Sequence, residues 1–474
     1  MKRVLRLNKN ILFLILIGIT FASCNEQNKK TAQGTWIGGE IVNPKTNYVI
    51  ISKNRTLVDT VRLDRNNYFH YEFKDFSPGI YTFRHFEYQV FYLEPQDSIM
   101  LRVNTLEFDE SLAFTGDGAD KNNFMMEMFL INEAENRLIS NLYLLSPQEY
   151  EVKLDSMRQV RIDLYDHFVE KNKVTDEFKE IVEANIAYDF STKKEWYIST
   201  NLFNSSEEKL SEIPASFYDF RSDIDYGNEE LRSYYSYYRF LGFHLDNLAY
   251  ERYQDKADYN RYSYIHNLHK TDLIDSLITN DSLKNQLLNT NIRRFLLNGK
   301  SPESQTALLD QFLKLNSNSA HHAQMKRLAK ATINLTPEHQ IPNLMLLTSD
   351  NTAKDLHSVF KKPTVIYFWS SQSIQHYTNI HMRASELGDK YPEYDFIGIN
   401  TDTHFKKWLK IVQTSGYNNL HEFQFEDIES AEQKLLISSL HKAIVVDGKG
   451  MILEGNTNLF SPRIESQLLS NLNK

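Results

Sequence analysis

The chain has 474 residues, enough for about three domains of ordinary size. Its formal net charge is −9 at pH 7, with 53 Lys and Arg residues against 62 Asp and Glu residues. This acidic balance excludes nucleic acid as an expected partner, because the phosphate backbone repels negative charge. The 27 Tyr and 29 Phe residues fit carbohydrate contacts as well as packed cores, and packed cores are the commoner use.

Residues 1–23 have the pattern of a bacterial lipoprotein signal peptide. Four basic residues precede the apolar run Ile11–Phe21, and Phe21–Cys24 matches a lipobox with Phe21 in place of the usual leucine. The alternative is an uncleaved membrane anchor, but the apolar run is shorter than the roughly 18–20 residues that a span requires. We therefore expect lipidation of Cys24, a polar tether over 24–33, and a cell-envelope protein held to a membrane by its lipid. Cleavage removes the four basic residues and changes the formal charge from −9 to −13.

Residues 34–117 are predicted to form a small antiparallel β-sandwich. Short apolar or alternating segments are separated by turn residues, and Pro78–Gly79 fits a turn in which glycine supplies a positive φ. The segments predicted as strands are Trp36–Val42, Tyr48–Ser52, Leu57–Leu63, Tyr68–Phe73, Ile80–Phe86, Val90–Leu93 and Ile99–Val103.

Residues 118–335 are predicted to be helical, because apolar residues there recur at spacings of three and four. The clearest stripe predicts a helix buried along one side. Its members are Leu231, Tyr234, Tyr238, Leu241, Leu245 and Leu248. The tyrosines of 234–238 also suggest a site for a sugar or aromatic ligand, although half of them lie on this stripe.

Residues 336–474 are predicted to form an α/β domain. Val365–Trp369 is an unbroken apolar run that suits a strand buried on both faces of a sheet, and Ser373 is placed to cap a following helix. Asp402 or Thr403 is expected to cap the next helix, which ends near Gly416. The later elements are predicted as strands Phe396–Asn400, Glu422–Phe425, Ala443–Val446 and Met451–Leu453, and helices Ser430–Leu440 and Arg463–Leu472.

This last domain resembles the TlpA-like branch of the thiol–disulfide oxidoreductases, which have a thioredoxin-like fold. Phe368–Trp369 and Val445–Gly450 match the family pattern. The two redox cysteines of the family fall on Ser373 and His376, and its cis-proline falls on His441. The preceding β-region resembles the sandwich of membrane-anchored TlpA-like lipoproteins, on the segments Pro78–Tyr81, Tyr92–Ile99 and Phe114–Ala119.

The altered motif positions are Trp369, Ser373, His376 and His441, and the resemblance implies that His376 and His441 are neighbours. Two imidazoles suggest a zinc or copper site, but no third ligand is identifiable. Ser373 and His376 suggest a nucleophile pair, but no orienting acid or oxyanion donor is visible. The remaining interpretation is that Ser373 caps the helix and His376 packs as a neutral ring. We expect no catalytic residue, metal or cofactor here.

Two functions follow from the resemblance. Disulfide exchange requires a thiolate and a second thiol, and Cys24 is the chain's single cysteine. We therefore expect a non-catalytic binding or assembly protein with a protein or peptide partner, because thioredoxin-like folds bind extended peptides beside the motif. The alternative is an envelope thiol–disulfide oxidoreductase of the TlpA family.

Overall fold

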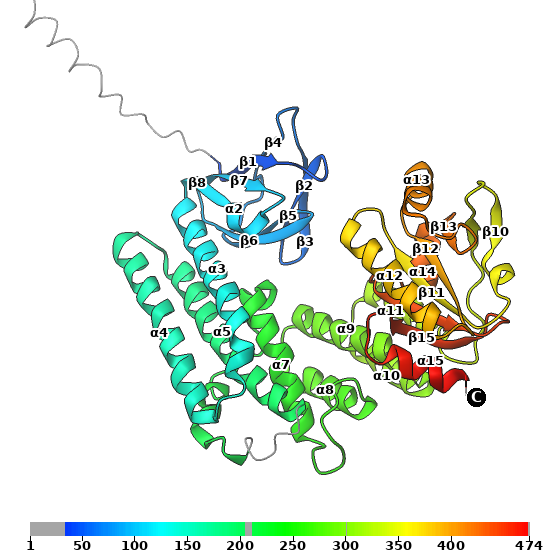
Figure 1. Cartoon of the computed structure of the whole chain (residues 1–474). Coiled ribbons are helices and arrows are strands. Elements are labelled where there is room, and N and C mark those ends of the chain that lie inside the picture. Colours follow the sequence, from blue (N-terminus) through cyan, green and yellow to red (C-terminus); the bar gives the residue numbers. More distant parts are fainter. Residues whose placement is uncertain (1–33, 204–210, 300, 473–474) are drawn as a thin grey trace, which may run out of the picture. The chain divides into compact units, whose positions relative to one another are not determined.

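The computed structural model describes residues 34–203, 211–299 and 301–472 (Figure 1). The predicted signal peptide, the lipidation residue Cys24 and the polar tether lie outside these residues. Within the described residues, no helix is both long and apolar enough to cross a bilayer. The predicted order of a β-rich region, a helical region and an α/β domain is confirmed.

The described chain groups into two compact units. The first holds the residues up to Lys193 together with Glu230–Tyr238, and the second holds Lys194–Glu229 and the residues from Arg239 onward. The sandwich belongs to the first unit and the α/β domain to the second. The domain limits expected from the sequence, at 117/118 and 335/336, stay predictions.

The β-region consists of two four-stranded sheets, with strand orders β4-β1-β7-β8 and β3-β2-β5-β6. All seven predicted strands are present, within a few residues of the expected limits. The prediction of a purely antiparallel sandwich is wrong, because β1 and β7 run parallel. An eighth strand, β8, was not predicted. The bounds are β1 (Trp36–Val42), β2 (Tyr48–Lys53), β3 (Thr56–Arg62), β4 (Tyr68–Glu72), β5 (Gly79–His85), β6 (Glu87–Leu93), β7 (Ser98–Asn104) and β8 (Ala113–Asp117).

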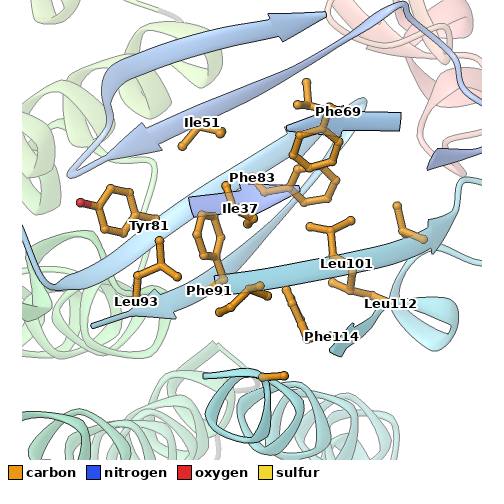
Figure 2. Packing of buried hydrophobic residues seen from close by; sticks show 14 of the residues in the cluster. Ile37, Ile51, Phe69, Tyr81, Phe83, Phe91, Leu93, Leu101, Leu112 and Phe114 are labelled. Carbon is orange, nitrogen blue, oxygen red and sulfur yellow. The ribbon is translucent and has the colours of Figure 1, made fainter. Parts of the chain in front are cut away.

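The sandwich core is built from alternate residues of these strands. Ile37, Phe83 and Phe91 are each at most 1% exposed and point between the two sheets (Figure 2). A side chain at Gly39 would place its Cβ 2.4 Å from the Leu101 carbonyl oxygen, so glycine permits the close parallel approach of β1 and β7. Gly79 has φ +129°, the positive value expected from the Pro78–Gly79 turn.

The helical region begins after the short helix α2 (Phe108–Ser111). Polar caps begin most of its helices; Ser146, for example, forms a capping box with Glu149 ahead of Pro147 at the first turn of α4. The bounds are α3 (Ala119–Leu142), α4 (Pro147–Lys171), α5 (Asp176–Phe203), η1 (Ala215–Arg221), η2 (Leu231–Ser233), α7 (Tyr235–Glu251), α8 (Tyr264–Leu277), α9 (Asp281–Asn298), α10 (Pro302–Leu315) and α11 (Ser319–Ile333).

The predicted stripe from Leu231 to Leu248 is only partly correct. Leu231 lies in the 3₁₀ turn η2 and Tyr234 is extended, so the helix α7 begins after both. The helix is also buried on more than one side, because polar residues of α7 are enclosed in hydrogen bonds. His244 Nδ1 lies 2.6 Å from Glu195 Oε1, and Asp246 accepts a 2.6 Å hydrogen bond from Lys270. Hydrophobic periodicity cannot reveal a polar face that is buried in this way.

The C-terminal domain has a seven-stranded sheet of order β10-β9-β13-β12-β11-β14-β15. Its centre is parallel, with β11, β12 and β13 adjacent, and β14 pairs antiparallel with β11. Alternate residues of β11 enter two separate cores on the two faces of the sheet. The bounds are β9 (Met345–Leu347), β10 (Ala353–Asp355), η3 (Leu356–Val359), β11 (Thr364–Trp369), α12 (Ile374–Lys390), β12 (Asp395–Asn400), α13 (Phe405–Ser415), β13 (Glu422–Phe425), α14 (Ile428–Leu435), β14 (Lys442–Val446), β15 (Ile452–Asn458) and α15 (Ile464–Leu472).

Two details of this domain differ from the prediction. α13 does end at Gly416, which has φ +70°, but its N-cap is His404 rather than Asp402 or Thr403. α14 was expected at Ser430–Leu440 and is shifted toward the N-terminus. Its start is fixed by Asp427, whose side chain accepts the Ser430 N–H, and it ends at Leu436 in the left-handed conformation.

Candidate functional site: the β11–α12 junction

The site lies where β11 ends and α12 begins. Trp369, the last residue of β11, is fully buried. Ser373 is the N-cap of α12, and its Oγ accepts the His376 backbone N–H at 3.3 Å. This is the capping role expected from the sequence, and it directs the hydroxyl to the helix backbone rather than to the His376 ring.

The turn between Trp369 and Ser373 is held by Asp402, which follows the neighbouring strand β12. Asp402 accepts hydrogen bonds from Ser370 Oγ at 2.5 Å and from the Ser371 backbone N–H at 2.6 Å. Burial opposes ionisation, but these bonds and one from Asn400 outweigh it and lower the pKa of Asp402. Asp402 was predicted as a possible cap of α13. It instead holds the turn between Trp369 and Ser373 by these hydrogen bonds.

His376 and His441 are neighbours, with ring centroids 5.1 Å apart and planes inclined by 28°. The Phe460 ring lies edge-on to His441 at 5.5 Å. Partial burial and then the neighbouring His441 and His381 lower the pKa of His376, against a smaller opposing effect of the Leu440 backbone. His376 is therefore neutral near pH 7, in keeping with its place in the first turn of a helix.

The geometry offers little for metal binding or nucleophilic catalysis. Over the described ranges, no group of three or more His, Cys, Asp or Glu side chains is placed to hold a metal ion. His376 and His441 are thus two imidazoles without a third side-chain ligand. The peptide bond before His441 is trans, as are all the others in the described parts of the chain.

Behind the motif lies a buried polar cluster that the sequence pattern does not predict. Glu422, the first residue of β13, is 2% exposed. Its carboxylate accepts hydrogen bonds from Trp369 Nε1 at 2.9 Å and from the Tyr367 hydroxyl at 3.0 Å. Burial and the negative charge of Glu422 raise the pKa of Tyr367 well above its ordinary value. The one feature of the sequence that could have indicated this cluster is a glutamate at the start of an apolar strand.

The third group on Glu422 is His381 of α12. Its Nε2 lies 3.1 Å from Glu422 Oε1, and its Nδ1 lies 2.6 Å from the Tyr377 carbonyl oxygen. The His381 ring also stacks on Tyr417 at 3.7 Å. Both ring nitrogens of His381 thus lie within hydrogen-bond distance of an oxygen atom. The contact between His381 and Glu422 joins α12 to β13, next to the Trp369 ring.

Comparisons with known proteins agree with this architecture. Residues 361–452 match a family model described as thioredoxin-like. No curated protein matches the chain. The chain is similar to a structure from Bacteroides vulgatus assigned as a thiol-disulfide oxidoreductase, at 20% identity and a TM-score of 0.26, over 29% of this chain and 97% of that one.

Two further solved structures are similar to this chain, with comparable sequence identity, TM-score and coverage. The thioredoxin domain of a thiol-disulfide oxidoreductase from Bacteroides vulgatus has 15% identity and a TM-score of 0.23, over 29% of this chain and 96% of that one. A thiol:disulfide interchange protein from a Bacteroides species has 16% identity and a TM-score of 0.22, over 26% and 81%. The family match and the strand order together show that the chain ends in a thioredoxin-like α/β domain, preceded by a β-rich region and a helical region.

Proposed function

We propose that this chain is a lipid-anchored cell-envelope protein whose thioredoxin-like domain binds a peptide or protein segment and does not catalyse disulfide exchange. The observation that carries the proposal is the identity of the motif residues. Ser373 and His376 stand where the resembled family has its two cysteines, and the sequence has one cysteine, Cys24, in the predicted lipobox.

The chemistry of the motif supports this proposal. Disulfide exchange begins with attack of a thiolate on a disulfide sulfur and is completed by a second thiol. The Ser373 hydroxyl is a far weaker nucleophile, and it is already engaged as a helix cap. If Cys24 carries a lipid, the mature chain has no thiol for either step.

The exposed side chains beside the motif support the proposed binding of a peptide. Ile374 at the start of α12 is 71% exposed, and Phe460 beyond β15 is 40% exposed next to His441. We call Ile374, His376, His441 and Phe460 the motif surface. Exposed apolar and aromatic side chains around a rigid helix start favour recognition of an extended peptide, and this use does not depend on cysteines.

The decisive experiment is a disulfide-reduction assay on the purified mature chain, with insulin as substrate and dithiothreitol as reductant. We expect no rate above the uncatalysed reaction. An active thioredoxin is the positive control. The double variant Ser373→Cys/His376→Cys restores both thiols at the start of α12, and we expect it to have only weak activity, because His441 replaces the proline that shapes the peptide groove in the resembled family. Catalysis by the unsubstituted chain would refute the proposal and favour the alternative, an envelope thiol–disulfide oxidoreductase, which the names of the similar structures suggest.

The binding role has its own test. Peptides selected from a random displayed library on the mature chain should lose at least tenfold in affinity when Ile374 or Phe460 is changed to Asp. Leu420→Asp is the matched control, since Leu420 is 80% exposed and lies outside the motif surface. Equal losses for all three variants would show that the motif surface is not the binding site.

A further inference from the structure

A cavity of about 530 Å³ lies within the first unit, between the edge of the sandwich and the helices that follow it. Residues of β6, α2, α3, α4 and α5 line it, together with the segment 234–236. The size is that of a small-molecule site. This cavity is separate from the motif surface, and the proposed function makes no use of it.

One side of the cavity, which we call its floor, is formed by apolar side chains, including flexible methionines. Met125 and Met128 of α3 are buried, as is Tyr234, and the half-buried Phe129 also lines the cavity. Methionine side chains adapt to ligands of varied shape, and their sulfur makes favourable contacts with aromatic rings. The floor therefore suits the hydrocarbon or aromatic body of a ligand.

The rim carries exposed aromatic rings. Phe86 is 78% exposed, Tyr88 58% and Tyr235 52%. Phe86 sits between β5 and β6 with φ +68°, a conformation that is unfavourable for a bulky side chain. Aromatic faces at a cavity mouth attract cations.

The charge of the lining is negative. Glu87, Asp109 and Glu133 line the cavity, and no Lys, Arg or His among the described residues forms an ion pair with any of them. The lining residue Arg161 does not compensate these charges, because its guanidinium is already paired with Glu135 and lies 3.0 Å from Asp189. The half-buried Asp109 and Glu133 and the exposed Glu87 thus line one cavity, and none of the three has an ion-pair partner among the described residues.

Asp109 shows the effect of this arrangement. Partial burial raises its pKa, and the charges of Glu87, Glu110 and Glu133 raise it further, against a hydrogen bond from Gln89 that lowers it. These groups face Asp109 from β6, from α2 itself and from α3. A bound cation would relieve the repulsion and stabilise the ionised carboxyl group.

We propose that this cavity binds a small organic cation with an apolar body. The ammonium group lies among the Asp109 and Glu133 carboxylates and the rim aromatics, and the body fills the methionine floor. A neutral ligand of the same shape lacks the charge attraction, and an anion is repelled by all three carboxylates.

Calorimetric titration of the full mature chain with three probes of similar shape tests the proposal. We expect 2-phenylethylammonium to bind saturably at one site per chain, 2-phenylethanol to bind at least tenfold more weakly, and 3-phenylpropionate not to bind. Absence of saturable binding by the ammonium probe at millimolar concentration would overturn the proposal, as would equal binding of all three probes.

Variants locate the site. Asp109→Asn and Glu133→Gln should each weaken 2-phenylethylammonium at least tenfold. Glu127→Gln is the matched control, because Glu127 is an exposed carboxylate on the same helix as Glu133 and does not line the cavity. Circular dichroism establishes that each variant is folded. Unchanged affinity in both cavity variants would overturn the assignment of the site.

The pH dependence supplies a readout that a purely structural role of Asp109 would not give. The cation binds the ionised carboxylate, so affinity should fall as the pH is lowered from 7 through the raised pKa of Asp109, and the fall should be smaller in Asp109→Asn. An identical pH profile in the two proteins would contradict the role of Asp109.

Discussion

Glu422 is a single carboxylate on which three donors from two other elements converge. Trp369 and Tyr367 of β11 and His381 of α12 all bond to it, and the carboxylate is 3% exposed. Loss of the shared carboxylate leaves these buried donors without their acceptor, and that cost exceeds the net value of the original hydrogen bonds.

We predict that Glu422→Gln lowers the free energy of unfolding by about 1–3 kcal/mol, the cost of leaving a buried donor without its acceptor, because the glutamine amide nitrogen cannot accept the hydrogen bond that a carboxylate oxygen accepts. Urea denaturation followed by Trp fluorescence measures this change. Glu426→Gln removes an exposed carboxylate just beyond the same strand, and should change stability by less than about 0.5 kcal/mol. Equal effects of the two substitutions would show that the cluster does not stabilise the domain.

Asp402 makes a prediction about pH. Its folded-state pKa is lowered below the ordinary value of 3.8, so the ionised form contributes stability above that value, and the contribution is lost as the pH falls through the folded-state pKa. Asp402→Asn should therefore be less stable than the parent at pH 7, and the difference should shrink toward pH 3. Thermal denaturation at several pH values checks this, and a difference that stays constant would argue against the assigned hydrogen bonds.

Residues such as Ser373, His376 and His441 could be placed from the sequence because each is tied to a local motif or to a known strand order. Glu422 and His381 could not be placed in this way. They are 41 positions apart, and their pairing depends on β13 lying beside α12. Asp402 was assigned to the nearest helix start, whereas its partners Ser370 and Ser371 lie about 30 residues earlier, across the sheet.

The helix α12 depends on its cap. Ser373 accepts the N–H of the first turn, and such a cap contributes about 1 kcal/mol to stability. We predict that Ser373→Ala lowers the unfolding free energy by roughly that amount, whereas Ser373→Asp keeps or improves it, because aspartate caps equally well and complements the helix dipole. Chemical denaturation of the two variants measures this. A loss of stability in Ser373→Asp equal to that in Ser373→Ala would refute the capping role.

At the level of elements, the limits of the strands could be predicted from the sequence more accurately than the pairing between strands. Turn residues bound each strand of the sandwich, so the seven expected strands lie close to the observed limits. β8 was missed because Phe114 is its one buried residue and Gly116 interrupts the pattern. The parallel pairing of β1 with β7 could not be predicted, because no local signal specifies which distant strand lies beside an N-terminal one.

At the scale of the whole molecule, the proposed anchor is testable through Cys24. If Cys24 is the lipidation site, Cys24→Ser should leave an uncleaved and unacylated precursor, because the modified thiol is the point of attachment. Intact-mass spectrometry and detergent-phase partition of the expressed protein measure both properties. Ser23→Ala keeps a small residue in the lipobox and should be processed normally. Normal processing of Cys24→Ser would refute the lipoprotein assignment.

The position of β1 has a consequence for the order in which the sandwich is completed during synthesis. β1 precedes the other described strands in the chain, yet it is central in its sheet, and Glu40 pairs with Arg102, 62 residues later. Contacts between such distant residues form slowly, because a long loop must close first. A nascent chain that stops short of β7 therefore has no partner for one whole edge of β1. We expect this domain to stay unfolded on the ribosome until Asn104 has emerged.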